Sequence, residues 1–174
     1  MTEKIRTAHF GEVDFETNKK LTFEKGLPGL DDEKAFALLT QEDQKPICWL
    51  QSLVHWQIAL PVINPFLIEP SYAFDITDSD VASLGVESVN DVCVLSVLVV
   101  PKNPNDMTVN LVAPIIINMK NWQGRQIILD DRRYSTRTRV SDMLDELRKK
   151  TEEDDKKTEA GAAEASVQPA KTVN

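Results

Sequence analysis

The sequence is poor in the residues that proteins use for chemistry. Its 174 residues include two histidines, His9 and His55, and two cysteines, Cys48 and Cys93. The cysteines have no CxxC spacing, which argues against a zinc ribbon or a redox pair, so we expect reduced thiols packed as small hydrophobic side chains. The chain contains no HExxH, GxSxG or EF-hand motif. We therefore predict a protein that is not an enzyme and that holds no metal and no cofactor.

The sequence also lacks a long apolar segment. No stretch approaches the run of about 20 apolar residues that a membrane-spanning helix needs. The N-terminal sequence MTEKIRTAHFGEVDFE has no apolar core of the kind found in signal peptides. We therefore expect a cytoplasmic protein that does not contact a membrane.

Basic residues are outnumbered by acidic ones. The chain has 20 Lys and Arg against 28 Asp and Glu, which gives a formal net charge of −8. An acidic surface repels phosphate, so we expect no direct binding of nucleic acid and faster encounter with basic proteins. One cationic cluster stands out at Arg132, Arg133, Arg137 and Arg139. If residues 134–140 form a strand, these arginines either meet an acidic partner or keep a sheet edge soluble.

Short apolar segments that alternate with polar residues predict a mainly β fold. A hairpin is expected from the segments around Val13 and Leu21, and further strands are expected at Val54–Leu60, Tyr72–Ile76, Val92–Val100, Leu111–Ile117 and Gln126–Leu129. Proline-rich turns punctuate them. Many short strands with such turns indicate an antiparallel barrel or a sandwich.

One or two short helices are also predicted. Thr77 or Asp78 can cap a helix that runs to Leu84 and stops at Gly85. Ser141 or Asp142 can cap a second helix, in which the apolar residues cluster on one face: Met143, Leu144 and Leu147.

The composition changes near residue 150. Residues 151–174 contain no aromatic residue, no Leu and no Ile, and carry six acidic against three basic residues. Ordering such a segment would cost on the order of 25–50 kcal/mol of backbone entropy. Burying its two valines would return only about 3–6 kcal/mol. We therefore predict a folded domain over residues 1–150 and a disordered acidic, alanine-rich tail over 151–174.

Two local patterns could suggest chemistry but have plainer interpretations. Glu24–Leu30 is glycine-rich but lacks the order of a phosphate-binding loop, and Pro28–Gly29 predicts a type II turn. His55 lies on the less apolar face of its predicted strand. An enzyme that used His55 with a nearby carboxylate is the least favoured of our hypotheses.

Several motifs occur in an order that resembles one protein family. They are FGE at Phe10–Glu12, Phe23 with GLPG at Gly26–Gly29, Phe36, LP at Leu60–Pro61, NPF at Asn64–Phe66, Tyr72, NLVAPIIIN at Asn110–Asn118, GRQIIL at Gly124–Leu129, and Tyr134. Across about residues 5–140 the chain resembles the FliW family of flagellar assembly factors. Leu30 departs from the family pattern, which more often has an aromatic residue after LPG.

The resemblance implies a compact antiparallel β-barrel-like domain without catalytic activity. Members of the family bind flagellin and also the translational regulator CsrA, which represses flagellin synthesis. Export of flagellin frees the FliW-like protein to capture the regulator, so the resemblance implies a partner switch. The alternative is a small-ligand-binding β-barrel that acts as an adaptor. The net charge and the polar tail favour a monomer when the protein is free.

Five residues are candidates for partner contact. Phe66 and Tyr72 flank Pro70 in a predicted exposed loop, where aromatic residues make good anchors. Trp122 lies in a polar turn, where its ring is expected to pack back or to meet a partner. Glu69 and Asp75 could pair with basic groups of the regulator.

Overall fold

The computed structural model describes residues 1–140, 143, 145–146, 149–150 and 152–158. The chain divides into two compact units, Met1–Ser141 and Asp142–Asn174. Described residues of the second unit are helical, including 152–158 of the predicted tail. The predicted caps Ser141 and Asp142, and the rest of the tail, lie outside the described residues. No helix in the described ranges is long and apolar enough to cross a membrane.

The first unit is built mainly from strands. They are β1 (Thr2–Arg6), β2 (Glu12–Glu16), β3 (Leu21–Thr22), β4 (Ala35–Thr40), β5 (Cys48–Ser52), β6 (Ala59–Ile63), β7 (Val92–Val99), β8 (Thr108–Val109), β9 (Ile115–Asn118), β10 (Gln123–Gln126) and β11 (Thr138–Arg139). Its helices are α1 (Asp78–Leu84) and five 3₁₀ turns, η1 (Thr17–Lys19), η2 (Glu42–Gln44), η3 (Pro65–Leu67), η4 (Val89–Asp91) and η5 (Pro104–Asp106).

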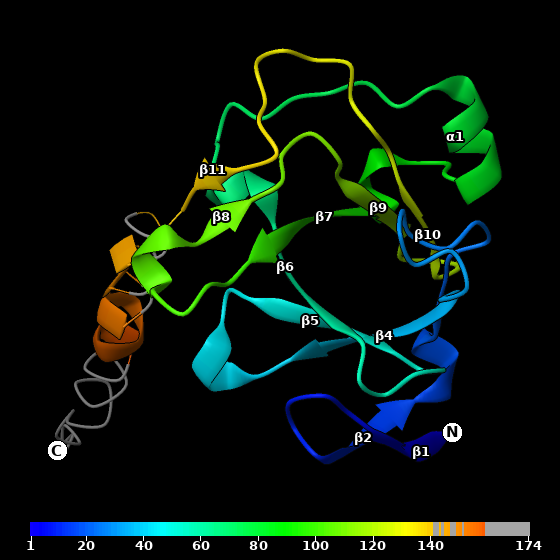
Figure 1. Ribbon diagram of the computed structural model, residues 1–174, viewed down its shortest axis with the longest axis horizontal. Helices are drawn as coiled ribbons and strands as arrows, with labels where there is room; N and C mark the ends of the chain where they lie inside the picture. Colours follow the sequence, from blue (N-terminus) through cyan, green and yellow to red (C-terminus); the bar gives the residue numbers. More distant parts are fainter. Residues whose placement is uncertain (141–142, 144, 147–148, 151, 159–174) are drawn as a thin grey trace, which may run out of the picture. The chain divides into compact units, whose positions relative to one another are not determined.

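Seven of the strands form a closed ring in the order β7-β6-β5-β4-β3-β10-β9, because β9 pairs back onto β7 (Figure 1). The pairs are antiparallel except β3–β10, which meet in parallel at Thr22 and Gln123. Strands β8 and β11 extend from β7, and β1 and β2 form a separate hairpin. Of the two predicted architectures, a barrel or a sandwich, the structure is a barrel.

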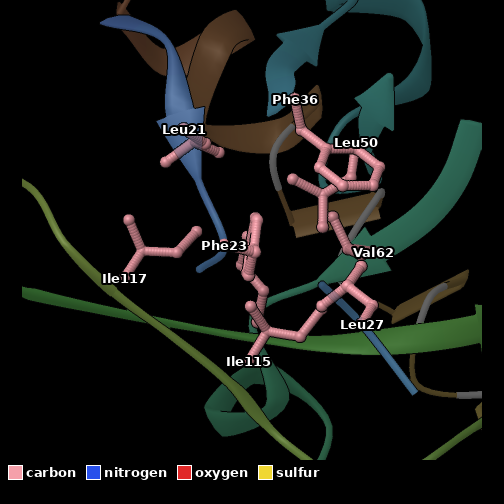
Figure 2. Close-up of a cluster of buried hydrophobic side chains, with 9 residues drawn as sticks. Leu21, Phe23, Leu27, Phe36, Leu50, Val62, Ile115 and Ile117 are labelled. Carbon is pink, nitrogen blue, oxygen red and sulfur yellow. The ribbon is translucent and has the colours of Figure 1, made fainter. Parts of the chain in front are cut away.

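Apolar side chains fill the barrel interior (Figure 2). The buried cluster consists of Leu21, Phe23, Leu27, Phe36, Leu50, Val62, Leu95, Ile115 and Ile117. Phe23 and Phe36 meet edge to face, with ring centres 5.5 Å apart. Full burial of each such side chain contributes about 1.5–3 kcal/mol. Both thiols are free and pack against this cluster, and burial raises the pKa of Cys93, as expected for an inert thiol.

Helix α1 lies outside the barrel and forms as predicted. The Thr77 hydroxyl accepts a hydrogen bond from the Asp80 amide at 3.1 Å, and Gly85 ends the helix with φ +63°. Asn118, at the end of β9, donates from its side chain to the Leu84 and Gly85 carbonyls at 2.9 and 3.0 Å. This asparagine therefore ties the end of α1 to the barrel.

The predicted hairpin of residues 13–23 is wrong in its pairing. Strand β2 pairs with β1, with Phe15 opposite Glu3. Strand β3 pairs instead with β4 and β10. The 3₁₀ turn η1 separates β2 from β3, so the chain leaves the hairpin and enters the barrel wall.

The predicted strand Val54–Leu60 is wrong because a turn occupies most of it. The Ser52 hydroxyl accepts hydrogen bonds from the amides of Val54 and His55 at 3.0 and 2.9 Å. These hydrogen bonds bend the chain between β5 and β6. The predicted strand Tyr72–Ile76 is a loop. Strand β7 confirms the predicted Val92–Val100 run almost to the residue.

The predicted strands at Leu111–Ile117 and Gln126–Leu129 are displaced. The Asn110 side chain accepts the amides of Val112 and Ala113 at 3.0 and 3.2 Å, so β9 begins only at Ile115. Strand β10 occupies Gln123–Gln126 and thus precedes the predicted segment. The turn at Pro28–Gly29 is confirmed: Gly29 has φ +80°, and the Leu30 amide bonds the Leu27 carbonyl at 2.7 Å.

Gly124 should be intolerant of a side chain. A Cβ at this position would lie 2.5 Å from the Phe23 ring. We expect Gly124→Ala to lower the free energy of unfolding by about 1–3 kcal/mol, measured by urea denaturation, because the core is overpacked. Adding Phe23→Leu should recover part of that loss. Strictly additive effects of the two substitutions would contradict this reason.

Candidate protein-binding surface

The carboxylate that the enzyme hypothesis required is that of Glu33, which lies just before β4 and contacts the turn after β5. Glu33 is only 3% exposed, and its carboxylate accepts a hydrogen bond from the Ser52 hydroxyl and contacts Nδ1 of His55. A serine nucleophile needs a base that takes its proton, as histidine does in a catalytic triad. Here the Ser52 hydroxyl donates a hydrogen bond to the Glu33 carboxylate and accepts hydrogen bonds from two backbone amides. The cluster therefore holds the turn in shape.

A groove borders this turn but does not include all three side chains. This groove, of about 290 Å³, is lined by Ser52 but by neither Glu33 nor His55. Within the residues that the structure describes, no three His, Cys, Asp or Glu side chains are placed to share a metal ion. The geometry thus offers packing and hydrogen bonding at this turn.

Four aromatic rings gather on the outside of the barrel. The ring of Tyr72 lies with its centre 5.6 Å from Phe66, 5.2 Å from Phe74 and 4.7 Å from Tyr134. Such edge-to-face and tilted contacts contribute about 0.5–1.5 kcal/mol each beyond the burial of area. We call residues 64–75, which carry three of these rings, the 64–75 loop.

Hydrogen bonds hold the 64–75 loop in place. The Asn64 side chain caps η3 by accepting the Phe66 amide at 2.9 Å. The hydroxyl of Tyr134 accepts the Ala73 amide at 2.9 Å and donates to the Ala73 carbonyl at 3.0 Å. The hydroxyl of Tyr72 donates to the Leu111 carbonyl at 2.7 Å. The loop is therefore fixed to two distant parts of the chain.

The expected exposure of Tyr72 is wrong. Its side chain is only 3% exposed, and burial raises the pKa of its hydroxyl. Phe66 is 41% exposed and presents an apolar surface over the buried tyrosine. The buried ring of Tyr72 thus packs against the exposed ring of Phe66.

The two predicted acidic contacts lie on the same loop. Glu69 accepts from the amide and hydroxyl of Ser71, and these hydrogen bonds lower the pKa of Glu69. Asp75 is exposed. The loop therefore combines one exposed aromatic ring with two carboxylates.

Trp122 lies elsewhere, in the turn between β9 and β10. Its backbone has φ +58°, which is rare for a bulky residue. Its ring packs partly against the barrel core and borders a groove of about 230 Å³ with Leu39 and the exposed Met119. The structure therefore does not bring Trp122 together with the other four predicted residues.

The sequence reasoning missed Phe74 and Tyr134 as members of the cluster. Their signal was present, since Phe74 alternates with Tyr72, but alternation was interpreted as a strand. Of the strand considered at residues 134–140, only Thr138–Arg139 pairs, as β11. Arg133 stacks 5.2 Å from the Tyr134 ring centre and bonds Asp131, so this arginine borders the aromatic cluster.

The buried hydroxyl of Tyr72 provides a test of this arrangement. Tyr72→Phe leaves the Leu111 carbonyl without its partner, so we expect the free energy of unfolding to fall by about 1–3 kcal/mol in urea. Tyr134→Phe, whose hydrogen bonds are exposed, is the matched control and should cost less. Equal losses for the two variants would contradict the account.

Comparison with known proteins places this fold in one family. A family model described as FliW protein matches residues 4–140. A flagellar assembly factor FliW from Thermosipho africanus is 38% identical over 133 residues, covering 76% of this chain and 92% of that relative. One from Caldicellulosiruptor saccharolyticus is 41% identical over 133 residues, covering 76% of this chain and 87% of that relative.

A solved structure agrees with the sequence relatives. The crystal structure of a flagellar assembly factor FliW superposes with a TM-score of 0.75 at 34% identity, and the match covers 79% of this chain and 96% of that one. The matched family region ends at residue 140, so it contains the whole closed barrel and the 64–75 loop. The chain therefore belongs to the FliW family of flagellar assembly factors.

Proposed function

We propose that this protein is a non-catalytic partner switch that binds flagellin and antagonises CsrA, which relieves repression of flagellin synthesis. The observation that carries the proposal is the 64–75 loop. Phe66 is exposed on a loop whose backbone is held by side-chain hydrogen bonds. A rigid aromatic anchor of this kind loses little entropy when it enters a pocket of a partner.

Charge supports the choice of a basic second partner. The chain carries a net charge of −8, and Glu69 and Asp75 follow the exposed ring of Phe66 on the same loop. Carboxylates at the rim of an interface accelerate encounter with a cationic protein more than they strengthen the final complex. A small, basic RNA-binding regulator fits this description.

The switch follows from mass action. A binder shared by two ligands is occupied by the abundant one, and the free fraction left for the other reports that abundance. Cytoplasmic flagellin would hold the protein, and export of flagellin would release it to CsrA. In this proposal the protein acts as a monomer in the cytoplasm and performs no chemistry.

A small-ligand adaptor has less support. Such a function needs a hollow barrel, whereas the interior here contains large apolar side chains such as Phe23 and Phe36, both fully buried. The larger grooves of the described residues are open and lie on the outside.

Phe66→Ala should weaken flagellin binding by at least about tenfold, because loss of an aromatic anchor typically costs 2 kcal/mol or more. Isothermal titration of purified flagellin into the full chain measures this. Val89→Ala is the matched control, because Val89 is 82% exposed but lies in η4, outside the 64–75 loop. No heat with either flagellin or CsrA for the unaltered protein would overturn the proposal, as would equal affinity of the Phe66→Ala variant.

Asp75→Lys should slow association with CsrA by about two- to tenfold at low salt, with a smaller effect at high salt. Stopped-flow mixing at two ionic strengths measures the rate. Asp43→Lys, in η2, makes the same change of net charge at another place and should slow association less. Equal slowing by both variants would show that only the total charge matters and not the 64–75 loop.

A further inference from the structure

The hairpin of β1 and β2 leaves one strand edge open. At the two ends of the ladder, backbone hydrogen bonds run from the Thr17 amide to the Met1 carbonyl at 3.0 Å and from the Thr7 amide to the Gly11 carbonyl at 2.8 Å. In an antiparallel ladder the bonded residues alternate. The backbones of Glu3 and Ile5 therefore face β2, and those of Thr2, Lys4 and Arg6 face away from it. In the described part of the chain, β1 pairs with no other strand.

A groove of about 290 Å³ borders this edge. Four consecutive residues of β1, Glu3–Arg6, line it, together with residues 52–54 and Trp56 from the turn after β5. Side chains of a strand alternate between its faces, so four consecutive lining residues place the groove along the edge of β1. Figure 1 shows the hairpin on the side of the barrel away from α1. Strand β2 pairs with the edge of β1 that does not border the groove.

The far wall of the groove is partly apolar. Val54 is 58% exposed and Trp56 is 37% exposed. Pockets that enclose small molecules begin at roughly 300 Å³ and are largely closed. This groove lies at the lower end of that range and is open, so it suits a few side chains of an extended chain.

The open edge carries two cations. Lys4 and Arg6 lie on one face of β1, two residues apart. Lys4 pairs with Asp14 at 3.1 Å, but both side chains are about two-thirds exposed, so the pair contributes little. Arg6 stacks over the Trp56 ring at 3.7 Å and makes no ion pair within the described residues. Both cations remain available to carboxylates of an added strand.

A second copy of this chain is a poor occupant of the edge. Antiparallel pairing of β1 with itself must match outward-facing residues with each other. The central register places Lys4 opposite Lys4. The neighbouring registers place Glu3 opposite Glu3, or Lys4 opposite Arg6. Like charges directly opposite are destabilising, so each register is penalised.

We propose that the free edge of β1 binds an extended segment of a partner protein, which adds as a strand. Acidic side chains of that segment pair with Lys4 and Arg6, and the alternating apolar side chains lie on the opposite face of the strand, the face of Ile5, which also lines the groove. Backbone hydrogen bonds supply the affinity, and the alternation of acidic and apolar residues supplies the selection. This surface is distinct from the 64–75 loop and does not depend on the function proposed for that loop.

A seven-residue peptide of alternating Val and Glu, acetylated and amidated, tests the proposal on the full chain by NMR titration of backbone amides. We expect saturable shifts at residues 2–6 and 52–56. Replacing each Glu of the peptide by Lys should weaken binding at least about fivefold, because the cationic edge then repels it. Absence of shifts at residues 2–6, or equal binding of the Lys peptide, would overturn the proposal.

Lys4→Pro separates the backbone contribution from the charge. Proline removes only the outward amide of Lys4, a position at which an edge strand tolerates it, so the bonds to β2 persist. We expect binding to weaken at least about tenfold, whereas the matched Lys4→Ala variant, which keeps the amide, should lose only about two- to threefold. Equal affinity of the two variants would overturn strand addition.

A second measurement needs no change in the protein. Methylating the peptide nitrogens that face β1 removes the donors of the added strand, whereas methylating the alternate nitrogens does not. We expect the first peptide to lose binding and the second to retain it. Equal binding of the two methylated peptides would overturn the proposal even if Lys4→Pro disturbed the hairpin.

Discussion

Closure of the barrel depends on the pairing of β7 with β9. Four residue pairs, from Val92 with Asn118 to Leu95 with Ile115, join the two ends of the strand order into a ring. Once the ring is closed, the side chains on its inner face point into the interior and fill it, as Figure 2 shows. Asn118, the last residue of that pairing, also anchors the end of α1.

Because the interior is filled, the features available to partners lie on the outside. The 64–75 loop crosses the exterior and is fastened by Tyr72 and Tyr134, so its exposed Phe66 is presented on a rigid support. Closure also removes most strand edges, which otherwise invite unwanted pairing. The edge of β1 stays open because the hairpin lies outside the ring. The two surfaces that we propose for partners thus both lie outside the closed ring.

The sequence predicted the elements that depend on local signals. Helix α1 has its cap and its stop within a few residues, and β7 is a continuous apolar run, so both were correct. Errors arose where a side chain redirected the backbone. Ser52 bends the chain into a turn within an alternating segment, and Asn110 delays the start of β9. Alternation alone cannot reveal such hydrogen bonds.

The positions of the predicted contact residues were also only partly predictable, for a similar reason. Phe66, Glu69 and Asp75 do lie on one loop, as their closeness in sequence implied. The burial of Tyr72 depends on Leu111 and Tyr134, which are far away in the chain, and so could not be inferred from its neighbours. The parallel meeting of β3 with β10 is equally non-local.

Hydrogen exchange of the full chain, alone and saturated with flagellin, tests the central claim most directly. That claim is that a packed barrel carries its binding function on fixed outer loops. The account predicts added protection at residues 64–75 and 131–134, with little change in barrel strands such as β5 and β7, whose amides are protected already. Protection confined to other segments, or loosening of the barrel strands on binding, would contradict it.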